Sequence, residues 1–241
     1  MQELQVNKEN YFSVLMAVYK KEQPLFFKEA LRSVFEQSLI PNEVVLVKDG
    51  PLTEELEQVI ADFSSKNEQL KIITLEKNQG LGEALRIGLN ACSFDLVARM
   101  DSDDICKPYR FEKQIAFLKE HQEITIVGSW IEEFSDCKEK IEAIRELPQE
   151  DKQLKIFMKW RNPFKHMTVM FRKKDILAVG GYQPFYLLED YYLWNRLANA
   201  NYCFANIGES LLWARGGYTM LERRGGLKYV VSESKLLKFM Y

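Results

Sequence analysis

Short apolar runs alternate with amphipathic stretches over residues 12–134, and this alternation constrains the fold more than any other feature of the sequence. The apolar runs are 12–18, 43–50, 70–76, 95–101 and 124–134. Between them, apolar residues recur at helical spacing in 24–38, 53–66, 81–91 and 108–121. Strands that alternate with helices form right-handed βαβ units and a mostly parallel sheet. We therefore predict an α/β protein with helices flanking the sheet.

The pattern loosens in the second half of the chain. Helices are predicted at 151–160 and 188–200, and short strands at 167–173, 202–207 and 210–216. No linker rich in Pro, Gly or Ser separates the halves, so we expect one domain with a smaller α+β lobe packed on the sheet. The predicted boundaries are residues 1–125 for the first half, 126–215 for the second half and 216–241 for a basic helical tail.

Charge and cysteine content exclude several classes of protein. The 33 basic residues nearly balance the 35 acidic ones, so the chain as a whole does not attract nucleic acid. The four cysteines are far apart and show no CxxC spacing. The N-terminus lacks a signal-peptide pattern, and no apolar run approaches the roughly 18 residues that cross a bilayer. We expect a cytoplasmic protein with reduced thiols that binds no nucleic acid.

Acidic residues gather where the predicted strands end, which is the edge where open α/β sheets bind ligands. The strand at 95–101 runs directly into Asp101, Ser102, Asp103 and Asp104. Three carboxylates this close repel one another unless a cation lies between them, and oxygen ligands suit Mg²⁺ or Mn²⁺. We predict a metal site on Asp101 and Asp103. The alternative is an acidic turn that caps the next helix.

Tyr19 and Asp49 end the first two predicted strands. The Asp49 carboxylate can accept a hydrogen bond from a base N–H or a ribose hydroxyl, and Gly50 permits a tight turn after it. The Tyr19 ring can offer its face to a base. The alternatives are an ordinary strand-ending turn and an aromatic residue at the rim of the sheet.

Glu189 and Asp190 open the late helix among bulky apolar residues. A partly desolvated carboxylate at such a position can act as a general base near neutral pH. The alternative is an acidic helix start that only interacts with the helix dipole. His166, between a helix and a strand, is a further ligand-facing candidate, and its alternative is a core or rim histidine.

Six stretches in fixed order, covering about residues 11–200, carry a family resemblance. They read VLMAVYKKE, EVVLVKDG, EKNQGLGEALRIGL, DLVARMDSDD, HMTVMFRK followed by VGGY, and LEDYYLWNRL. Together they resemble the family 2 glycosyltransferases, which are inverting sugar transferases with the Rossmann-like GT-A fold. The ARMDSDD stretch is most similar to the bacterial subgroup that builds surface polysaccharides and O-antigen units.

The resemblance implies a binding role for several residues. Tyr19 would stack on the nucleotide base and Asp49 would bind it. Asp101 would lie near the ribose and the metal. Arg86 would approach the donor from the helix after Asn78-Gln79-Gly80. Residues 1–125 would then bind the nucleotide sugar, and residues 126–215 would bind the acceptor and complete the catalytic site.

The resemblance also implies a reaction. Asp103 would hold Mg²⁺ or Mn²⁺ on the donor diphosphate, and Asp190, beside Glu189, would be the catalytic base. The donor would be a UDP-sugar, and the acceptor a glycan or a polyprenyl-diphosphate-linked saccharide at the cytoplasmic membrane face. Two alternatives remain: a sugar nucleotidyltransferase, and a non-catalytic module that binds nucleotide sugars.

The tail combines basic residues with apolar ones at roughly helical spacing. From Arg223 to Tyr241 there are five basic residues and one acidic residue, Glu233. The apolar residues are Leu227, Val230, Val231, Leu237 and Tyr241. Such a segment can lie peripherally on an anionic membrane. The alternative is a helix that packs its apolar stripe back on the lobe.

Overall fold

We describe residues 11–135, 137–216 and 227–240 of a computed structural model of the chain. Its strands are β1 Phe12–Val18, β2 Glu43–Lys48, β3 Leu70–Thr74, β4 Leu96–Met100, β5 Ile105–Cys106, β6 Ile124–Phe134, β7 Ala143–Arg145, β8 Met170–Arg172 and β9 Cys203–Arg215. Its helices are α1 Pro24–Phe35, α2 Glu54–Ser64, α3 Leu81–Ala91, α4 Arg110–Glu120, α5 Asp151–Phe157, the 3-10 turn η2 His166–Thr168, α6 Lys173–Ala178, α7 Glu189–Asn199 and α9 Leu227–Met240.

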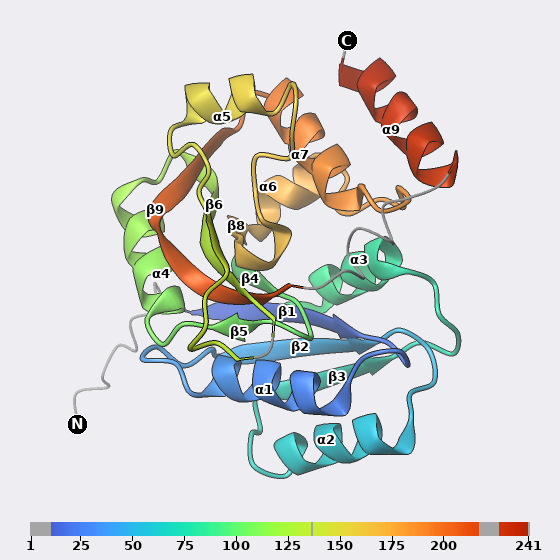
Figure 1. Ribbon diagram of the computed structural model, residues 1–241. Coiled ribbons are helices and arrows are strands. Elements are labelled where there is room, and N and C mark those ends of the chain that lie inside the picture. Colours follow the sequence, from blue (N-terminus) through green and yellow to red (C-terminus); the bar gives the residue numbers. More distant parts are fainter. Residues whose placement is uncertain (1–10, 136, 217–226, 241) are drawn as a thin grey trace, which may run out of the picture.

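All the strands join one nine-stranded sheet with the order β3-β2-β1-β4-β8-β6-β9-β5, and β7 pairs with the outer part of β6 (Figure 1). The parallel pairings among β1 to β4 run for five or six residues in register. The parallel pairing of β6 with β9 is longer and contains register shifts. The antiparallel pairings of β5, β7 and β8 involve only two or three residues each. The sheet is therefore mostly parallel, as the alternation in the sequence predicts.

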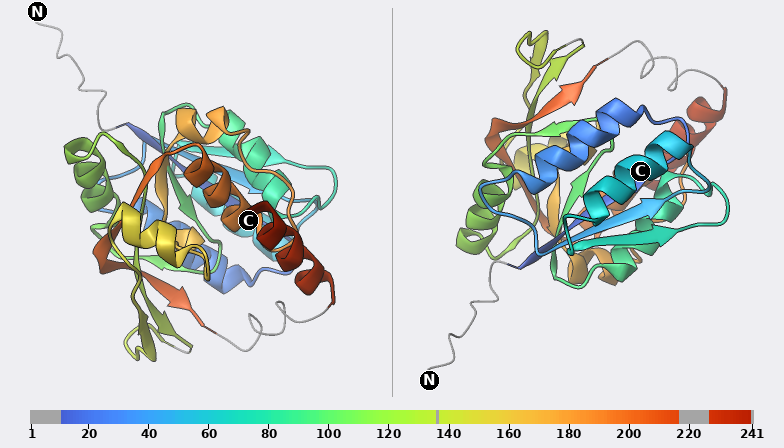
Figure 2. Two further views of the ribbon diagram at one scale, coloured as in Figure 1. Left: turned by 90° about the horizontal axis from the view of Figure 1, so that it is seen from above. Right: turned by 90° about the horizontal axis from the view of Figure 1, so that it is seen from below.

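Helices cover both faces of the sheet because side chains alternate along each strand. In β1, Val14 and Met16 pack with α1, α2 and α4, whereas Leu15 packs with α3, α5, α6 and α7. Seen from below, α1 and α2 lie in front of the sheet; seen from above, α5, α7 and α9 lie nearest the viewer (Figure 2). Burial on both faces explains why the central strands are continuous apolar runs.

Helix α3 approaches the sheet closely at Gly88. A Cβ atom at this position would lie 2.5 Å from Cδ1 of Leu15 and 2.7 Å from Cγ2 of Val47. Both of these strand residues are fully buried. Glycine is therefore required here by the close packing of the helix against β1 and β2, which fixes the position of the α3 N-terminus at the opposite edge.

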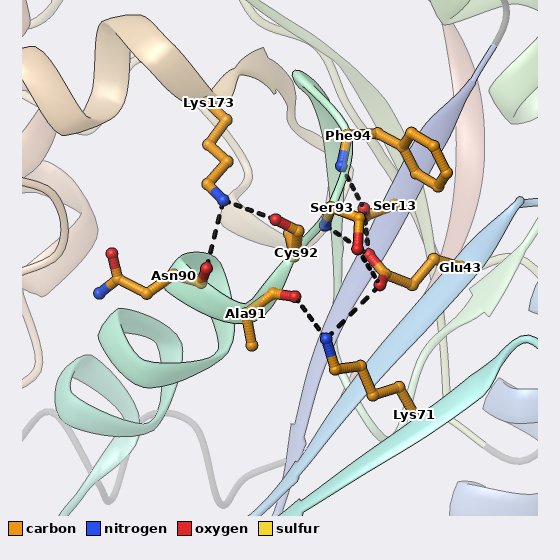
Figure 3. A network of polar contacts seen from close by, with 9 residues as sticks. All are labelled: Ser13, Glu43, Lys71, Asn90, Ala91, Cys92, Ser93, Phe94 and Lys173. Carbon is orange, nitrogen blue, oxygen red and sulfur yellow. Dashed lines mark hydrogen bonds and ion pairs between the residues drawn. The ribbon is translucent and has the colours of Figure 1, made fainter. Parts of the chain in front are cut away.

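At the amino ends of the strands, a buried polar network joins β1, β2 and the segment before β4 (Figure 3). The Glu43 carboxylate accepts hydrogen bonds from Ser13 Oγ at 2.6 Å, from Ser93 N at 2.8 Å and from Ser93 Oγ at 2.7 Å. Burial alone would raise the pKa of Glu43, but these hydrogen bonds hold it below its usual value. This network fastens the sheet at the edge opposite the ligand-binding one.

The second half differs from the prediction in two places. Residues 167–173, predicted as one strand, form the end of η2, the short strand β8 and the start of α6. The two strands predicted at 202–207 and 210–216 are one strand, β9, whose pairing with β6 contains register shifts. These irregularities allow Gly208 and Glu209 to interrupt the apolar pattern without ending the strand.

The tail helix α9 packs on the loop before α7 and on α7 itself. Leu236 is buried, Ser232 Oγ donates a hydrogen bond to the Tyr186 carbonyl at 2.9 Å, and Phe239 meets the Tyr192 ring edge-on. Val230 and Val231, from the predicted stripe, are about half exposed. Arg223, Arg224, Tyr241 and the side chains of Leu227, Lys228 and Leu237 lie outside the described residues.

Candidate active site

The carboxyl ends of β1, β2 and β4 meet at one edge of the sheet, because these strands are parallel neighbours. Tyr19 directly follows β1, Asp49 directly follows β2 and Asp101 directly follows β4. The structure thus brings three of the predicted site residues to the edge where open α/β sheets bind ligands.

Asp101, Asp103 and Asp104 form an acidic cluster between β4 and β5. One carboxylate oxygen from each lies within 4.8 Å of the others. Burial and the carboxylates of Asp101 and Glu22 raise the pKa of Asp103 to about 7. Burial, Asp103 and Asp101 also raise the pKa of Asp104 well above its usual value. The cluster is therefore short of compensating positive charge near neutral pH.

Two arginines compensate only part of this negative charge. The Arg99 guanidinium pairs with the Asp101 carboxylate, and the Arg215 backbone N–H donates to Asp104 Oδ1 at 2.8 Å. The Arg215 side chain donates to the Asp103 carbonyl at 3.1 Å and pairs with Glu29 at 2.6 Å. Among the ion pairs of the described residues, none reaches the Asp103 carboxylate.

This cluster fits a hard divalent cation. Its side chains offer only carboxylate oxygens, which Mg²⁺ and Mn²⁺ prefer over nitrogen or sulfur ligands. Burial and the neighbouring carboxylates raise the pKa of Asp103 to about 7, and a cation beside it would stabilise its charged form. Asp103 and Asp101 are the residues best placed to hold it, since the Asp104 carboxylate already accepts the Arg215 amide.

The Asp49 carboxylate organises the loop that precedes α3. Its oxygens accept hydrogen bonds from Gln79 N at 2.7 Å, from Asn78 Nδ2 at 2.8 Å and from Gly80 N at 3.0 Å. Gly50, with a φ of 88°, allows the backbone to pass close to this loop, because a Cβ there would lie 2.6 Å from Asn78 N. Asp49 therefore ties the end of β2 to the start of α3.

Tyr19 and Arg86 remain candidates on different grounds. Tyr19 is partly exposed at the end of β1, so its ring is available to a ligand. Arg86 is partly exposed on α3, but its guanidinium forms a two-bond contact with Glu83 on the same helix, at 2.6 and 2.8 Å. A role for Arg86 toward a ligand requires this contact to rearrange.

Glu189 and Asp190 form the first turn of α7. Burial, Asp190 and Asp101 raise the pKa of Glu189 to about 7. The Asp190 carboxylate accepts hydrogen bonds from Asn162 Nδ2 at 2.7 Å and from the Tyr191 backbone N–H at 2.7 Å. A Cβ at Gly82 in the first turn of α3 would lie 3.2 Å from the Glu189 Cβ, so the acidic pair on α7 lies beside the sheet edge where α3 begins.

The backbone before α7 is strained. Leu187 has a φ of 57°, in the left-handed region that favours glycine. On the neighbouring helix, a Cβ at Gly82 would lie 3.2 Å from the Glu189 Cβ, so α3 and α7 touch at their N-termini. Such strained conformations persist where the surrounding packing fixes them, and they are frequent at functional sites.

Behind the acidic groups lies a buried cluster that the sequence did not reveal in full. Arg99 is 2% exposed, and its Nε and Nη1 atoms have no hydrogen-bond partner. His166 Nε2 lies 2.8 Å from the Tyr182 hydroxyl, and burial and the Arg99 charge lower the pKa of His166 well below its usual value. His166 is therefore neutral, and its ring also meets Trp194 edge-on.

Four contacts of the candidate site were not predicted from the motifs. They involve Arg99, Asn162, Arg215 and Glu22. The pairing of Arg99 with Asp101 has a local signal, because a charge inside an apolar strand indicates a buried ion pair and Asp101 follows two residues later. Asn162 and Arg215 reach the site only through the fold, since Arg215 lies 111 residues from Asp104 along the chain.

Comparison with known proteins agrees with this geometry. Residues 13–180 match the family described as Glycosyl transferase family 2. A UDP-Gal:alpha-D-GlcNAc-diphosphoundecaprenol beta-1,3-galactosyltransferase from Escherichia coli is 44% identical over 95% of this chain and 83% of its own length. An amylovoran biosynthesis glycosyltransferase from Erwinia amylovora is 40% identical over 94% of this chain and 84% of its own length.

Solved structures share the fold at lower sequence identity. S. aureus TarS 1-349 in complex with UDP-GlcNAc superposes with a TM-score of 0.71 at 20% identity, over 94% of this chain and 65% of that one. A mannosyltransferase from Pyrobaculum calidifontis, in complex with GDP-Man and Mn²⁺, gives a TM-score of 0.66 at 14% identity, over 93% of this chain and 69% of that one. At these identities the likeness establishes the fold.

Proposed function

The chain belongs to glycosyl transferase family 2 and is a glycosyltransferase with the GT-A fold, and we propose that it transfers a sugar from a UDP-sugar to a saccharide hydroxyl. We propose a saccharide linked to a polyprenyl diphosphate as the acceptor, in surface polysaccharide synthesis. The two relatives at 40% and 44% identity, with their printed roles, support this choice.

The observation that carries the proposal is the contact between the first turns of α3 and α7. A Cβ at Gly82 would lie 3.2 Å from the Glu189 Cβ, and Asp49 holds the loop before α3, so the acidic pair on α7 lies beside the sheet edge that carries the acidic cluster. Sugar transfer needs both acidic groups, because the enzyme must bind the diphosphate of the donor and deprotonate the hydroxyl of the acceptor.

In this proposal the donor lies along the carboxyl edge of the sheet. Tyr19 stacks on the uracil ring, and Asp49, with the 78–80 loop that it holds, binds the base. Arg86 and Glu189 face the donor sugar and diphosphate. His166 supplies a neutral imidazole in the wall behind them. Residues 1–125 bind the donor, and residues 126–215 bind the acceptor.

Asp103 and Asp101 would hold Mn²⁺ or Mg²⁺ at the donor diphosphate. When bound, the cation supplies Lewis-acid stabilisation of the negative charge that develops on the departing diphosphate. The pKa of about 7 for Asp103 means that this carboxyl gives up its proton readily once a cation is offered near neutral pH.

Asp190 accepts the proton of the acceptor hydroxyl. The hydroxyl oxygen forms a bond to the anomeric carbon while the bond from that carbon to the diphosphate oxygen breaks, and UDP leaves with the electron pair. One in-line displacement inverts the anomeric configuration. The Asn162 amide, 2.7 Å from Asp190 Oδ2, orients the carboxylate for this role.

The site of action follows from the acceptor. Among the described residues, no helix combines the length and the apolar character that a membrane span needs. We propose that the enzyme works at the cytoplasmic membrane face. For the tail, the packing of Leu236 and Phe239 on the lobe supports a structural role, and a membrane contact by Val230 and Val231 stays a prediction.

An assay of UDP release tests the proposal. The protein is incubated with Mn²⁺, a panel of UDP-sugars and a synthetic GlcNAc-diphospholipid, and the product is identified by mass. We expect one UDP-sugar to give UDP and a product heavier by one hexose or N-acetylhexosamine. Pyrophosphate-dependent formation of a nucleotide sugar would instead favour a nucleotidyltransferase, and binding without turnover would favour a non-catalytic module.

A further inference from the structure

The outer face of α5 and the turn that follows it expose large apolar side chains. Trp160 is 80% exposed and Ile156 is 54% exposed. On the inner face of the same segment, Leu154 and Met158 are buried in the core. The buried residues anchor the segment to the core. The two exposed apolar side chains therefore face solvent at a fixed position on the surface.

Basic residues surround these two apolar side chains. Lys152, Lys159 and Arg161 are all exposed, and together with Ile156 and Trp160 they form what we name the α5 surface. Residues 151–165 contain five basic residues and one acidic residue, Asp151, which pairs with Lys155 at 2.9 Å. This local excess of positive charge contrasts with the net charge of −2 for the whole chain.

The same segment is connected directly to the candidate base. Asn162, two residues after Trp160, donates to Asp190 Oδ2 at 2.7 Å. The Tyr191 hydroxyl donates to the carbonyl of Met158, two residues before Trp160. The α5 surface therefore lies at the outer end of a segment whose inner side holds the first turn of α7.

An exposed tryptophan beside basic residues matches the boundary of an anionic bilayer. Tryptophan favours the interface between lipid headgroups and acyl chains, and basic residues are attracted to anionic headgroups. We propose that the α5 surface docks this protein on an anionic lipid bilayer. Helix α9 lies at the same end of the molecule, so this end faces the membrane as a whole (Figures 1 and 2).

Docking through the α5 surface would place the candidate base near the membrane. A saccharide carried on a lipid diphosphate would then reach Asp190 from the bilayer, while the UDP-sugar enters from solution. The orientation of the acceptor rests on the proposed function, whereas the binding of the bilayer does not. The two claims can therefore fail separately.

Co-sedimentation with vesicles of phosphatidylethanolamine and phosphatidylglycerol tests the docking surface, with phosphatidylcholine vesicles as the neutral reference. The full chain should bind the anionic vesicles. Lys152→Gln, Lys159→Gln and Arg161→Gln combined should weaken binding about 100-fold, at about fivefold per basic residue. Trp160→Ser should weaken it about tenfold, because a large aromatic side chain no longer enters the interface.

The matched controls are exposed residues in or next to α1, α2 and α4, away from the α5 surface. Lys28→Gln, Lys66→Gln and Lys119→Gln combined remove the same charge, and Tyr109→Ser removes an aromatic side chain that is 59% exposed. Both controls should bind vesicles like the parent chain. Equal binding by the α5-surface variants and their controls, or no binding by the parent chain, would overturn the proposal.

Two further measurements separate this surface from the tail and from catalysis. Loss of vesicle binding in Val230→Ser with Val231→Ser, but not in the α5-surface variants, would assign docking to α9 and overturn the proposal. With a water-soluble saccharide acceptor, Trp160→Ser should keep the parent kcat, whereas KM for an acceptor embedded in vesicles should rise about tenfold. Absence of transfer to either acceptor, with vesicle binding intact, would instead contradict the proposed function.

Discussion

At the scale of single residues, Asp103 is an acidic-cluster carboxylate that no ion pair among the described residues compensates. Arg99 pairs with Asp101 and the Arg215 amide binds Asp104, but neither forms an ion pair with the Asp103 carboxylate. Its pKa of about 7 is the consequence of burial and of its acidic neighbours. A site with this imbalance attracts a cation, and in the proposed function Asp103 would hold it.

Asp103→Asn should abolish the dependence of UDP binding on Mn²⁺. The amide keeps the size of the side chain but removes the negative charge that holds the cation, so we expect UDP affinity in Mn²⁺ to fall about 100-fold. Calorimetric titration of UDP in the presence of Mn²⁺ measures this change. Asp62→Asn, an exposed acid on α2, is the control. Parent-like UDP affinity in Asp103→Asn would show that Asp103 is not a metal ligand.

The acidic residues themselves were predictable, because strand-end positions in an α/β sheet converge on one edge. Their partners were not. Asn162 and Arg215 reach Asp190 and Asp104 through contacts between segments distant in the sequence, and no motif or spacing encodes such contacts. For Asp49, the pattern indicated a hydrogen-bonding carboxylate, and the structure adds that the 78–80 loop occupies its oxygens.

At the scale of elements, the positions of β1 to β4 and α1 to α4 followed from hydrophobic periodicity alone. The strand β5 did not, and β8 was predicted longer than it is, because pairings of two or three residues leave little periodic pattern. The order β4-β8-β6-β9 also depends on contacts between distant segments rather than on local sequence. Periodicity therefore predicted the half with βαβ units well and the second half only in outline.

The close contact of α3 with the sheet gives an element-scale prediction. Gly88→Ala would gain about 1 kcal/mol from helix propensity, but its Cβ would clash with the buried Leu15 and Val47 side chains. Overpacking costs about 1–3 kcal/mol, so we expect the free energy of unfolding to fall by about 1 kcal/mol. Urea denaturation measures this change, and Asn90→Ala, exposed on the same helix, should leave stability within about 0.5 kcal/mol. A more stable Gly88→Ala protein would contradict the packing described for α3.

At the scale of the whole molecule, the two edges of the sheet respond to pH in opposite directions. The pKa of Glu43 is lowered from 4.5 in the folded state. The contribution of Glu43 to the free energy of unfolding is therefore fully present above pH 4.5 and is lost as the pH falls below that value. The pKa values of Asp103 and Glu189 are both raised to about 7. The folded state therefore binds more protons than the unfolded chain between their usual values and about pH 7, and stability falls as the pH rises through this range.

The metal-free protein should consequently melt at a lower temperature at about pH 8 than at about pH 5. Mn²⁺ should raise Tm mainly at the higher pH, because protons no longer compete with the cation for Asp103. Thermal unfolding followed by circular dichroism, with and without Mn²⁺, measures both effects. In Asp103→Asn, the difference in Tm between about pH 5 and about pH 8 should be smaller than in the parent protein, and Mn²⁺ should no longer raise Tm. A pH dependence identical in the parent and Asp103→Asn would show that this carboxyl does not carry the effect.

In the proposed mechanism the acidic cluster after β4 binds the donor, and Asp190 takes the acceptor proton. The most direct test is to measure donor affinity and turnover together in Asp190→Asn, whose amide preserves the shape of the side chain beside Asn162. We expect the Kd for the UDP-sugar in Mn²⁺ to stay within about twofold of the parent value while kcat falls by about 10²–10⁴-fold. Loss of donor affinity, or a kcat close to that of the parent enzyme, would contradict the assignment of Asp190 as the base.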